Sequence, residues 1–426
     1  MVSQPVAFTG TVLAAARDLS AIRVNAARML AVLDALNEYG VDPDGGHSRL
    51  GLSPSEDSAR RLLTEVAATA GLGSTVDQAG NLFLHRGMSL PREPVLLMGS
   101  HVDTVLRGGR FDGAYGVVAA LEVLRILTEH DIPTRYEPIV AAFSNEEGAL
   151  FPPFWGSMAV AGKLADPAAA MDRDGNSIRF PLARAGGDLD NIDKAEWPPG
   201  SVGAYLELHI EQGPVLESAD IPIGIVSGIV GRTILEINVH GHQNHAGTTP
   251  MEQRRDALAA AAQIVLELEK AATERKLCVV GTVGDLKVSP GQTNVVPGLV
   301  ELTAEFRDLD AARLDRLESL LRAEFAKIAS ERGVVIDVQT TMRSAPVRTA
   351  SALQRAIGAA AEDLSLRYRF LPSGAGHDAQ IVAGLAPVGM IFVPSRAGIS
   401  HAPEEHTAPM HLVAGANVLL HAARRV

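Results

Sequence analysis

The sequence predicts an α/β protein with a second, smaller domain inserted into the first. In most of the chain, short and almost continuously apolar runs alternate with helical patterns, which is typical of buried parallel strands and their crossover helices. Between residues 226 and 337 the expected strands instead alternate apolar and polar side chains. The length of 426 residues also exceeds the usual size of a single core. We therefore expect a main domain of residues 1–225 and 338–426, and an inserted domain of residues 226–337.

The main domain is expected to alternate helices and strands along the chain. In order, we expect helical structure to about residue 70, a strand at 95–98, a helix at 116–129, a strand at 138–143 and, after residue 344, a helix and a strand at 387–393. In open α/β sheets, ligands bind outside the carboxyl ends of the strands. Two polar segments, one around His101 and one around Glu146, follow the first two of these strands.

The inserted domain is expected to be a split-βαβ sandwich of order β-α-β-β-α-β. Its predicted elements are a strand at 233–240, a helix at 255–273, strands at 277–283 and 297–308, a helix at 309–332 and a strand at 334–338. In the first strand Leu235, Ile237 and Val239 share one face, and polar residues occupy much of the other.

Composition excludes several classes of partner. The net charge is −12, and no basic run is present that would neutralise a phosphate backbone, so we expect no nucleic-acid partner. The single cysteine, Cys278, allows neither an intramolecular disulfide nor a thiolate metal cluster. The apolar run at Thr11–Ala16 is too short for a signal peptide, and no window approaches the roughly 20 apolar residues of a membrane span. We therefore expect a cytoplasmic protein with no membrane partner.

Three short segments carry side chains that suit a two-metal hydrolase. They are Gly99-Ser-His-Val-Asp-Thr104 with Asp112 soon after it, Asn145-Glu-Glu-Gly148, and Ser400-His-Ala-Pro403. Histidine and carboxylate are the ligands that borderline divalent cations prefer. Asp103 is placed to accept a proton from the His101 imidazole and fix its tautomer. For Asp112 the alternative is an N-cap or turn aspartate.

Glu146 and Glu147 form an adjacent pair of carboxylates directly behind a buried strand. Two carboxylates in that position are costly unless a cation or a proton compensates them. One glutamate is therefore expected to bind metal, and the other to take a proton from metal-bound water.

Other candidates are weaker when each is considered alone. His209 and His401 are individually more typical of core or loop histidines, and for His245, in the loop Gly241–Pro250, the alternative is turn and capping chemistry. Asn294 and Arg307 could bind a carboxylate, because a planar guanidinium suits two-point contact.

Eight motifs, in order, resemble the M20 metallopeptidase-like amidohydrolases. The branch they resemble contains N-carbamoyl-L-amino acid hydrolases, β-ureidopropionases and allantoate amidohydrolases. The motifs are Gly-Ser-His-Val-Asp-Thr, Asp-Gly-Ala-Tyr-Gly-Val, Glu-Glu-Gly, Glu-Leu-His-Ile-Glu-Gln-Gly-Pro, His-Ala-Gly-Thr-Thr-Pro-Met, Gln-Thr-Asn-Val-Val-Pro-Gly, Gly-Ala-Gly-His-Asp-Ala and Ser-His-Ala-Pro-Glu.

The resemblance implies a di-metal aminopeptidase-like catalytic domain and a ferredoxin-like insert that serves as lid and homodimerisation domain. It implies two divalent ions per subunit, zinc, manganese, cobalt or nickel. His101 and His209 would hold one ion, Glu147 and His401 the other, and Asp112 would bridge them. The remaining implied roles are Glu146 as general base, His245 as oxyanion donor in the partner subunit's site, and Gln212, Asn294, Arg307 and His377 as substrate-positioning residues.

The implied reaction is hydrolysis of an N-carbamoyl-L-amino acid to the amino acid, carbon dioxide and ammonia, with a metal-bridging hydroxide as nucleophile. The alternatives are another N-acyl amino acid or dipeptide-like amide, or allantoate or β-ureidopropionate. Aminoacylase and dipeptidase branches generally carry Asp or Glu where His209 stands, which favours the carbamoylase branch. A non-catalytic binding protein would be expected to have lost a ligand or the base, and this sequence retains all of them.

The sequence departs from the family pattern in one loop. Leu150 and Met158 stand where the family commonly has arginines. Phe151, Phe154 and Trp155 crowd the same loop, so we expect either an apolar substrate pocket or simple packing of the loop. Both features make a polar substrate such as allantoate less favoured.

Overall fold

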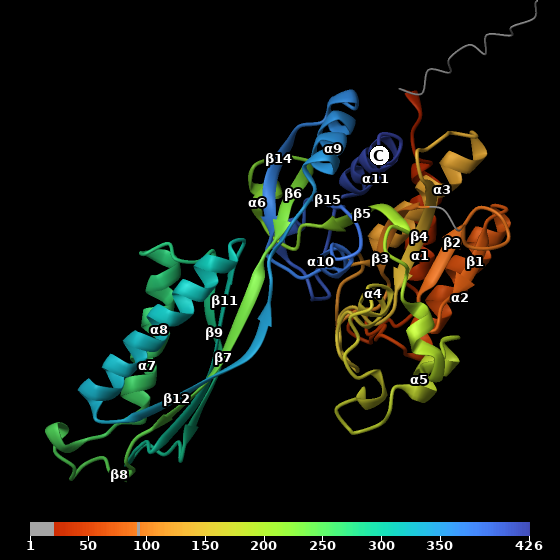
Figure 1. Ribbon diagram of the computed structural model, residues 1–426. Coiled ribbons are helices and arrows are strands. Elements are labelled where there is room, and N and C mark those ends of the chain that lie inside the picture. The colour runs from red at the N-terminus through yellow and green to blue at the C-terminus, as the bar shows by residue number, and fades with distance from the viewer. Residues whose placement is uncertain (1–20, 92–93) are drawn as a thin grey trace, which may run out of the picture.

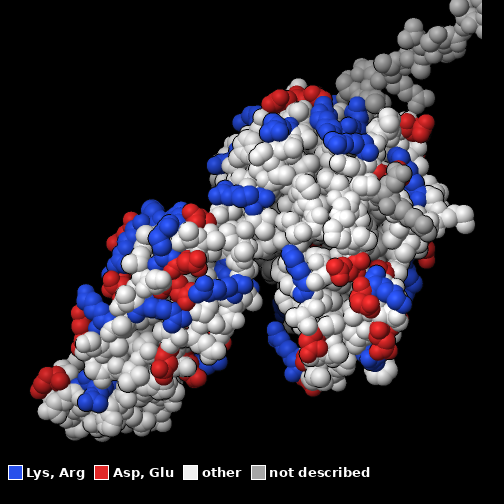
Figure 2. Space-filling model, in the orientation of Figure 1, with Lys and Arg blue, Asp and Glu red and all other residues white. Residues whose placement is uncertain are grey.

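The computed structural model describes residues 21–91 and 94–426, which form a larger α/β part and a smaller part that projects from it (Figure 1). The expectations for residues 1–20, including Thr11–Ala16, lie outside the described residues. A narrow junction joins the two parts, and Figure 2 shows a hollow between them below it.

The larger part is built on a mixed sheet of nine strands. Its order is β1 (Gly73–Val76), β2 (Leu82–His85), β4 (Glu137–Phe143), β3 (Val95–His101), β5 (Val202–Ile210), β15 (Val388–Val393), β6 (Ile223–Ile229) and β13 (Val347–Arg348), with β14 (Tyr368–Ser373) paired to β6. The four central strands β4, β3, β5 and β15 are parallel. Every residue of β3 and β15 is buried, which explains their continuous apolar runs.

Helices cover both faces of this sheet (Figure 1). The long ones are α1 (Ala26–Leu36), α2 (Pro54–Thr69), α3 (Ala114–Glu129), α9 (Ser351–Asp363) and α11 (Pro409–Ala423), and the short ones are α4 (Trp155–Val160), α5 (Arg179–Arg184), α6 (Val215–Ser218) and α10 (Asp378–Val382). Side chains of Asn25 and Ser53 cap the first two by accepting main-chain N–H groups. Among the helices of the described residues, none combines the length and apolar character needed to cross a membrane.

The strands divide their side chains between two cores. Leu96 and Met98 of β3 pack in the core with α1, α3, α9 and α11, whereas Val95 and Leu97 point into the core on the opposite face. Helix α3, expected to begin at residue 116, begins at Ala114, and its residues are all buried through Leu124. It lies between the sheet and the outer helices, so its buried residues are almost all apolar, and the exception, Glu122, is paired with Arg28.

The smaller part is an antiparallel sheet of four strands with two helices. The sheet order is β12 (Val335–Ser344), β7 (Gly231–His240), β11 (Leu299–Asp308) and β9 (Val280–Ser289), and the helices are α7 (Ala257–Thr273) and α8 (Ala311–Arg332). In chain order these elements read β-α-β-β-α-β. Leu235, Ile237 and Val239 are fully buried against the helices, while Glu236 and His240 are exposed, as the alternation predicted.

Two strands of this sheet differ from their predicted limits. Strand β12 continues to Ser344, beyond the expected end at residue 338, and β9 spans Val280–Ser289 instead of 277–283. The polar end of β12 is a strand because it pairs along β7, with Ser344 opposite Arg232. A small pair of strands, β8 (Asn244–His245) and β10 (Val295–Val296), lies at the far end of this part (Figure 1).

Candidate active site

Four parallel strands deliver the candidate ligands to one edge of the large sheet. His101 is the last residue of β3, Glu146 and Glu147 follow β4, His209 lies near the end of β5, and His401 lies in the connection after β15. Strand β3 lies between β4 and β5, so the chain runs from β3 to one neighbour and returns later on the other side. Such a switch in strand order opens a crevice at the carboxyl ends of the strands.

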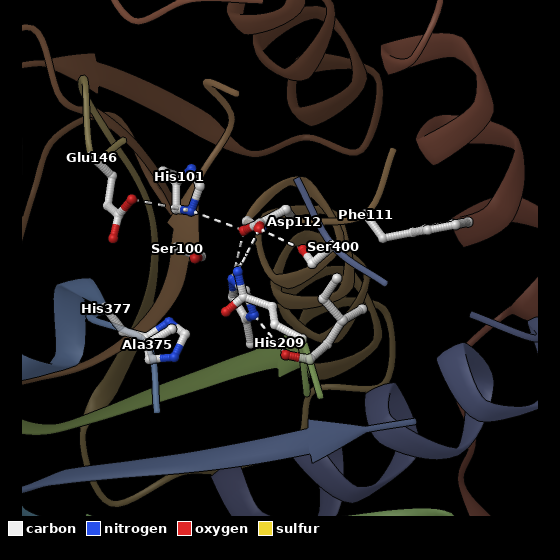
Figure 3. A network of polar contacts seen from close by, with 12 residues as sticks. Ser100, His101, Phe111, Asp112, Glu146, His209, Ala375, His377 and Ser400 are labelled. Carbon is white, nitrogen blue, oxygen red and sulfur yellow. Dashed lines mark hydrogen bonds and ion pairs between the residues drawn. The ribbon is translucent and has the colours of Figure 1, made fainter. Parts of the chain in front are cut away.

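Asp112 lies at the centre of the cluster (Figure 3). Its Oδ1 is 3.0 Å from Nε2 of His209 and 3.5 Å from Nε2 of His101. Its Oδ2 is 3.2 Å from Nε2 of His401. The alternative interpretation of Asp112 as an N-cap is wrong, because Gly113 occupies the N-cap of α3 and no side chain caps that helix. The two carboxylate oxygens instead face different histidines.

The cluster is able to hold metal. Ligand atoms lie within 4.8 Å of one another in three groups, which are His101–Asp112–His209, His101–Glu146–Glu147 and Asp112–Glu147–His401. Oε1 of Glu147 is buried without a hydrogen-bond donor among the described residues, and Nε2 of His401 lies 3.5 Å from it. Buried carboxylate and imidazole groups aimed at one another are the donor set that divalent transition metals prefer.

Main-chain carbonyls orient the two buried histidines. Nδ1 of His101 lies 3.0 Å from the carbonyl oxygen of Asp103, and Nδ1 of His209 lies 2.8 Å from that of Ile210. A proton donated from Nδ1 to a carbonyl leaves the lone pair on Nε2. In both residues Nε2 is the atom that faces Asp112.

The structure corrects the expected role of the Asp103 carboxylate. Its Oδ1 is 3.6 Å from Nδ1 of His101, and the hydrogen bond of that nitrogen is with the main-chain oxygen of Asp103. The two carboxylate oxygens accept the main-chain N–H groups of Glu146 and Glu147, each at 3.1 Å. The side chain of Asp103 therefore positions the segment that carries both glutamates.

Burial and mutual charge shift the pKa values of the cluster. Burial raises the pKa of Glu146 well above its ordinary range and that of Glu147 to about 7, and neighbouring carboxylates add to both shifts. Burial alone would lower the pKa of His101, but Glu146, Asp103 and Asp112 raise it overall. These raised pKa values favour protonated carboxyl groups, which would lessen the repulsion within the crowded cluster. A bound cation would replace those protons.

Sequence reasoning missed Glu405, which supports the central aspartate. Its buried carboxylate accepts the main-chain N–H groups of Phe111 at 2.8 Å and Asp112 at 3.2 Å, and the hydroxyl of Ser400 at 2.7 Å. Its position beside Glu404 in a polar loop carries no signal of this role. The contact joins segments almost 300 residues apart, which only the folded chain brings together.

A second missed carboxylate, Glu207, lies beneath the cluster. It is fully buried on β5 and accepts the hydroxyl of Ser100 at 2.7 Å and the main-chain N–H of Ala379 at 2.9 Å. Burial raises its pKa. It fastens β3 and the start of α10 to β5, two residues before His209.

A cavity of about 250 Å³ opens from the cluster. Three of the predicted substrate-positioning residues, Gln212, Arg307 and His377, line it. Nε2 of Gln212 donates to Oδ2 of Asp112 at 2.7 Å, and the His377 ring packs against that of His209 with centroids 4.6 Å apart. Arg307 comes from β11 of the smaller part, so both parts of the molecule contribute to this cavity.

The structure places His245 and Asn294 elsewhere. His245 lies in β8 and pairs with Val295 of β10, directly after Asn294, at the far end of the smaller part (Figure 1). Both residues are exposed. A single chain therefore does not bring them to the cluster.

The aromatic loop divides between packing and cavity. Phe151 and Trp155 are buried with Leu52 and Ile178, and the Trp155 indole donates to the carbonyl of Ala79 at 3.2 Å. Phe154 alone of the three lines the cavity beside the cluster. The cavity beside the cluster therefore does not include Phe151 or Trp155, whose side chains pack within the loop, and Trp155 also borders a separate cavity.

Comparisons with known proteins agree with this geometry. The model of the family described as peptidase family M20/M25/M40 matches residues 97–425. An N-carbamoyl-L-amino acid amidohydrolase of Geobacillus stearothermophilus is 41% identical over 91% of this chain and 95% of its own length. An allantoate amidohydrolase of Escherichia coli is 38% identical over 90% of this chain and 94% of its own length.

Solved structures show the same relationship. A hydantoinase/carbamoylase-family amidase of Burkholderia multivorans matches with a TM-score of 0.87 and 36% identity, covering 95% of this chain and 98% of that one. The match runs over both parts of the molecule and includes the strands that carry the candidate ligands. The chain belongs to peptidase family M20/M25/M40.

Proposed function

We propose that this protein is a metal-dependent hydrolase of N-carbamoyl-L-amino acids. The observation that carries the proposal is the position of Asp112 among three histidines and two glutamates, in a cavity that an arginine of the second part also lines. The relative from Geobacillus stearothermophilus, whose name states this activity, supports the choice of substrate.

The cluster suits two divalent ions. His101 and His209 would hold one ion and Glu147 and His401 the other, and Asp112, whose two oxygens face different histidines, would help to hold both. Zinc, manganese, cobalt and nickel all accept this set of ligands. Bound ions would polarise the scissile carbonyl and lower the pKa of a water molecule beside it.

In this proposal Glu146 would act as the general base. Its Oε2 lies 3.6 Å from Nε2 of His101, and its side chain faces the cluster from the opposite side to Asp112 (Figure 3). It takes a proton from the attacking water and then donates it to the substrate nitrogen as the carbon–nitrogen bond breaks. The products are the amino acid and carbamic acid, which decomposes to carbon dioxide and ammonia.

Arg307, Gln212 and His377 would position the substrate. The Arg307 guanidinium donates to the carbonyl of Gly374 at 2.6 Å and pairs with Glu305 at 2.6 Å, which holds its plane at the mouth of the cavity. A fixed guanidinium suits a carboxylate, because it offers two parallel N–H donors.

The smaller part would act as lid and as dimer interface. Nδ1 of His245 accepts the N–H of Gly247 at 3.0 Å, so the neutral ring carries its proton on Nε2 and can donate it to a developing oxyanion. Because His245 and Asn294 lie away from the cluster of their own chain, they would complete the site of a second copy. The functional unit in this proposal is a homodimer.

The test is a comparison of amides of one amino acid. Metal-free protein is reloaded with manganese or zinc and given the N-carbamoyl, N-formyl and N-acetyl derivatives of L-methionine, a methionyl dipeptide, and allantoate. We expect metal-dependent release of methionine and ammonia in equal amounts from the N-carbamoyl compound, and none from its D-enantiomer. Faster turnover of the acetyl compound, the dipeptide or allantoate would overturn the proposed substrate class.

A further inference from the structure

We propose that a second cavity beside the metal cluster is the subsite for an apolar substrate side chain, and that Met158 limits the length of that side chain. This inference rests on the proposed function and specifies its substrates. The cavity has a volume of about 460 Å³, within the usual range of small-molecule sites.

The second cavity adjoins the cavity at the cluster. Five residues line both: Pro153, Phe154, Arg232, Arg307 and Gly376. A molecule whose reacting carbonyl lies at the cluster therefore passes the two arginines before it enters the second cavity.

The two arginines at this boundary share one carboxylate, so the three side chains together carry one net positive charge. Arg232 of β7 and Arg307 of β11 are opposite each other in the sheet. A single carboxylate, Glu305, lies 2.6 Å from Arg307 and 3.4 Å from Arg232. Two guanidinium groups and one carboxylate favour one further anion, such as the carboxylate of an amino acid. The α-carbon would then lie at the boundary, with its side chain directed into the second cavity.

The lining of the second cavity is predominantly apolar. Its apolar side chains are Phe154, Met158, Val230, Met342, Val347 and Ile381. Of the other charged lining residues, Arg343 lies 3.1 Å from Asp315, and Lys163 donates to the main-chain carbonyl of Ile381 at 3.0 Å. A charged side chain in this cavity would exchange its hydration for a largely apolar lining.

Met158 separates this cavity from a third one. The third cavity has a volume of about 320 Å³ and shares Pro153, Met158 and Lys163 with the second. Met158 belongs to α4, and its side chain is only partly buried. An unbranched thioether adapts its shape to a neighbouring ligand but still blocks the space behind it. Shortening this residue would join the two cavities.

The experiment measures kcat/KM for N-carbamoyl derivatives of a side-chain series. The series runs from L-alanine through L-norvaline and L-norleucine to L-2-aminooctanoate, with L-aspartate as the charged member. For the metal-loaded wild type we expect about fourfold per methylene, or about 60-fold from alanine to norleucine, and then a decline. Met158→Ala should move the maximum toward 2-aminooctanoate. Met158→Arg should remove most of the norleucine advantage.

The matched controls are Met88→Ala and Met88→Arg, because Met88 is fully exposed on the β2–β3 connection. These controls should leave the ranking unchanged. A wild type that prefers alanine or aspartate would overturn the inference. An unchanged ranking in Met158→Ala that retains its metal and melting temperature would also overturn it.

Binding of the free amino acids, measured by calorimetry, separates the two proposals. One outcome is that no N-carbamoyl compound is hydrolysed, but norleucine binds more tightly than alanine and Met158→Arg removes the difference. That outcome would contradict the proposed reaction and support the proposed subsite. Equal binding of norleucine and alanine would contradict the subsite whatever the reaction.

Discussion

The two ends of this molecule hold their polar residues in opposite ways. At the edge of the large sheet, His101, Asp112 and His209 are at most 4% exposed. Main-chain carbonyls orient the two histidines, and the Glu405 carboxylate accepts the main-chain N–H of Asp112. At the far end of the small sheet, His245 and Asn294 are exposed in a short strand pair. The first group lies together within one chain, whereas the second lies on the smaller part, away from the cluster.

The difference follows from strand direction. Parallel strands bring their carboxyl ends to one edge, so residues that are distant in sequence meet there and become buried. Antiparallel strands that extend from the body carry their connecting loops away from it. In the proposed site, a single chain therefore orients the metal-binding cluster, whereas His245 and Asn294 would take part only after two chains associate.

The largest expected effect tests the buried end. Glu146→Gln should reduce kcat by about 10³-fold, because proton transfer is lost while the ligands remain. Metal content, measured by plasma mass spectrometry, should not change. Glu38→Gln, at an exposed position after α1, is the matched control. Full turnover by a Glu146→Gln protein that retains its metal would exclude Glu146 as the base.

Metal removal should distinguish the two ends directly. At a free metal concentration about 1,000 times Kd, binding should stabilise the fold by about 4 kcal/mol, measured by denaturant unfolding. In hydrogen exchange, removal should accelerate exchange in residues 95–147, 202–213 and 399–405, which contain the expected metal ligands. Residues 241–250 should be unaffected. Equal acceleration in both regions would show that the two ends are not independent.

His245→Ala tests whether the far end serves a second subunit. Loss of one oxyanion donor should reduce kcat by about 10²-fold. Mixing this variant with Glu146→Gln under conditions of subunit exchange should restore about a quarter of wild-type activity, because each mixed dimer then contains one intact site. Mixtures that stay inactive although mixed dimers form would contradict a shared site.

The smallest effect concerns the support of Asp112. Glu405→Gln should weaken metal binding by about 10- to 100-fold. The two carboxylate oxygens of Glu405 accept the main-chain N–H groups of Phe111 and Asp112 and the Ser400 hydroxyl, and glutamine replaces one of these oxygens with an NH2 group that cannot accept. Competition with a chelator measures the affinity. The neighbouring Glu404→Gln, at an exposed position, is the control. If both variants bind metal equally, Glu405 does not position the site.

Much of the fold and of the cluster was predictable from sequence. Continuous apolar runs identified β3, β4 and β15, and alternation identified the buried face of β7, because each pattern reports how many faces of a strand are covered. Polar segments directly after two of these strands predicted that His101 would lie near Glu146 and Glu147, and the family resemblance implied the rest of the ligand set. All five expected ligands and Glu146 do lie together.

Local patterns also left real alternatives, and packing decided among them. Phe151 and Phe154 are three residues apart in one loop, yet the first lies in a core and the second lines the cavity. Asp103 was expected to bond to His101 through its carboxylate, but the turn after β3 presents its main-chain oxygen there. Sequence spacing does not specify such directions, because the chain around each residue sets its rotamer.

The sequence by itself determined the chemistry of the site: which carboxylates and imidazoles follow buried strands, and the apolar periodicity that makes those strands form. Only the tertiary structure decided the contacts between distant segments. It placed Glu405 beneath Asp112, set Arg232 opposite Arg307, and carried His245 away from the cluster. The physical reason is that the position of a strand along the chain follows from its local apolar pattern. Which distant residue a side chain contacts depends instead on how whole helices and strands pack together.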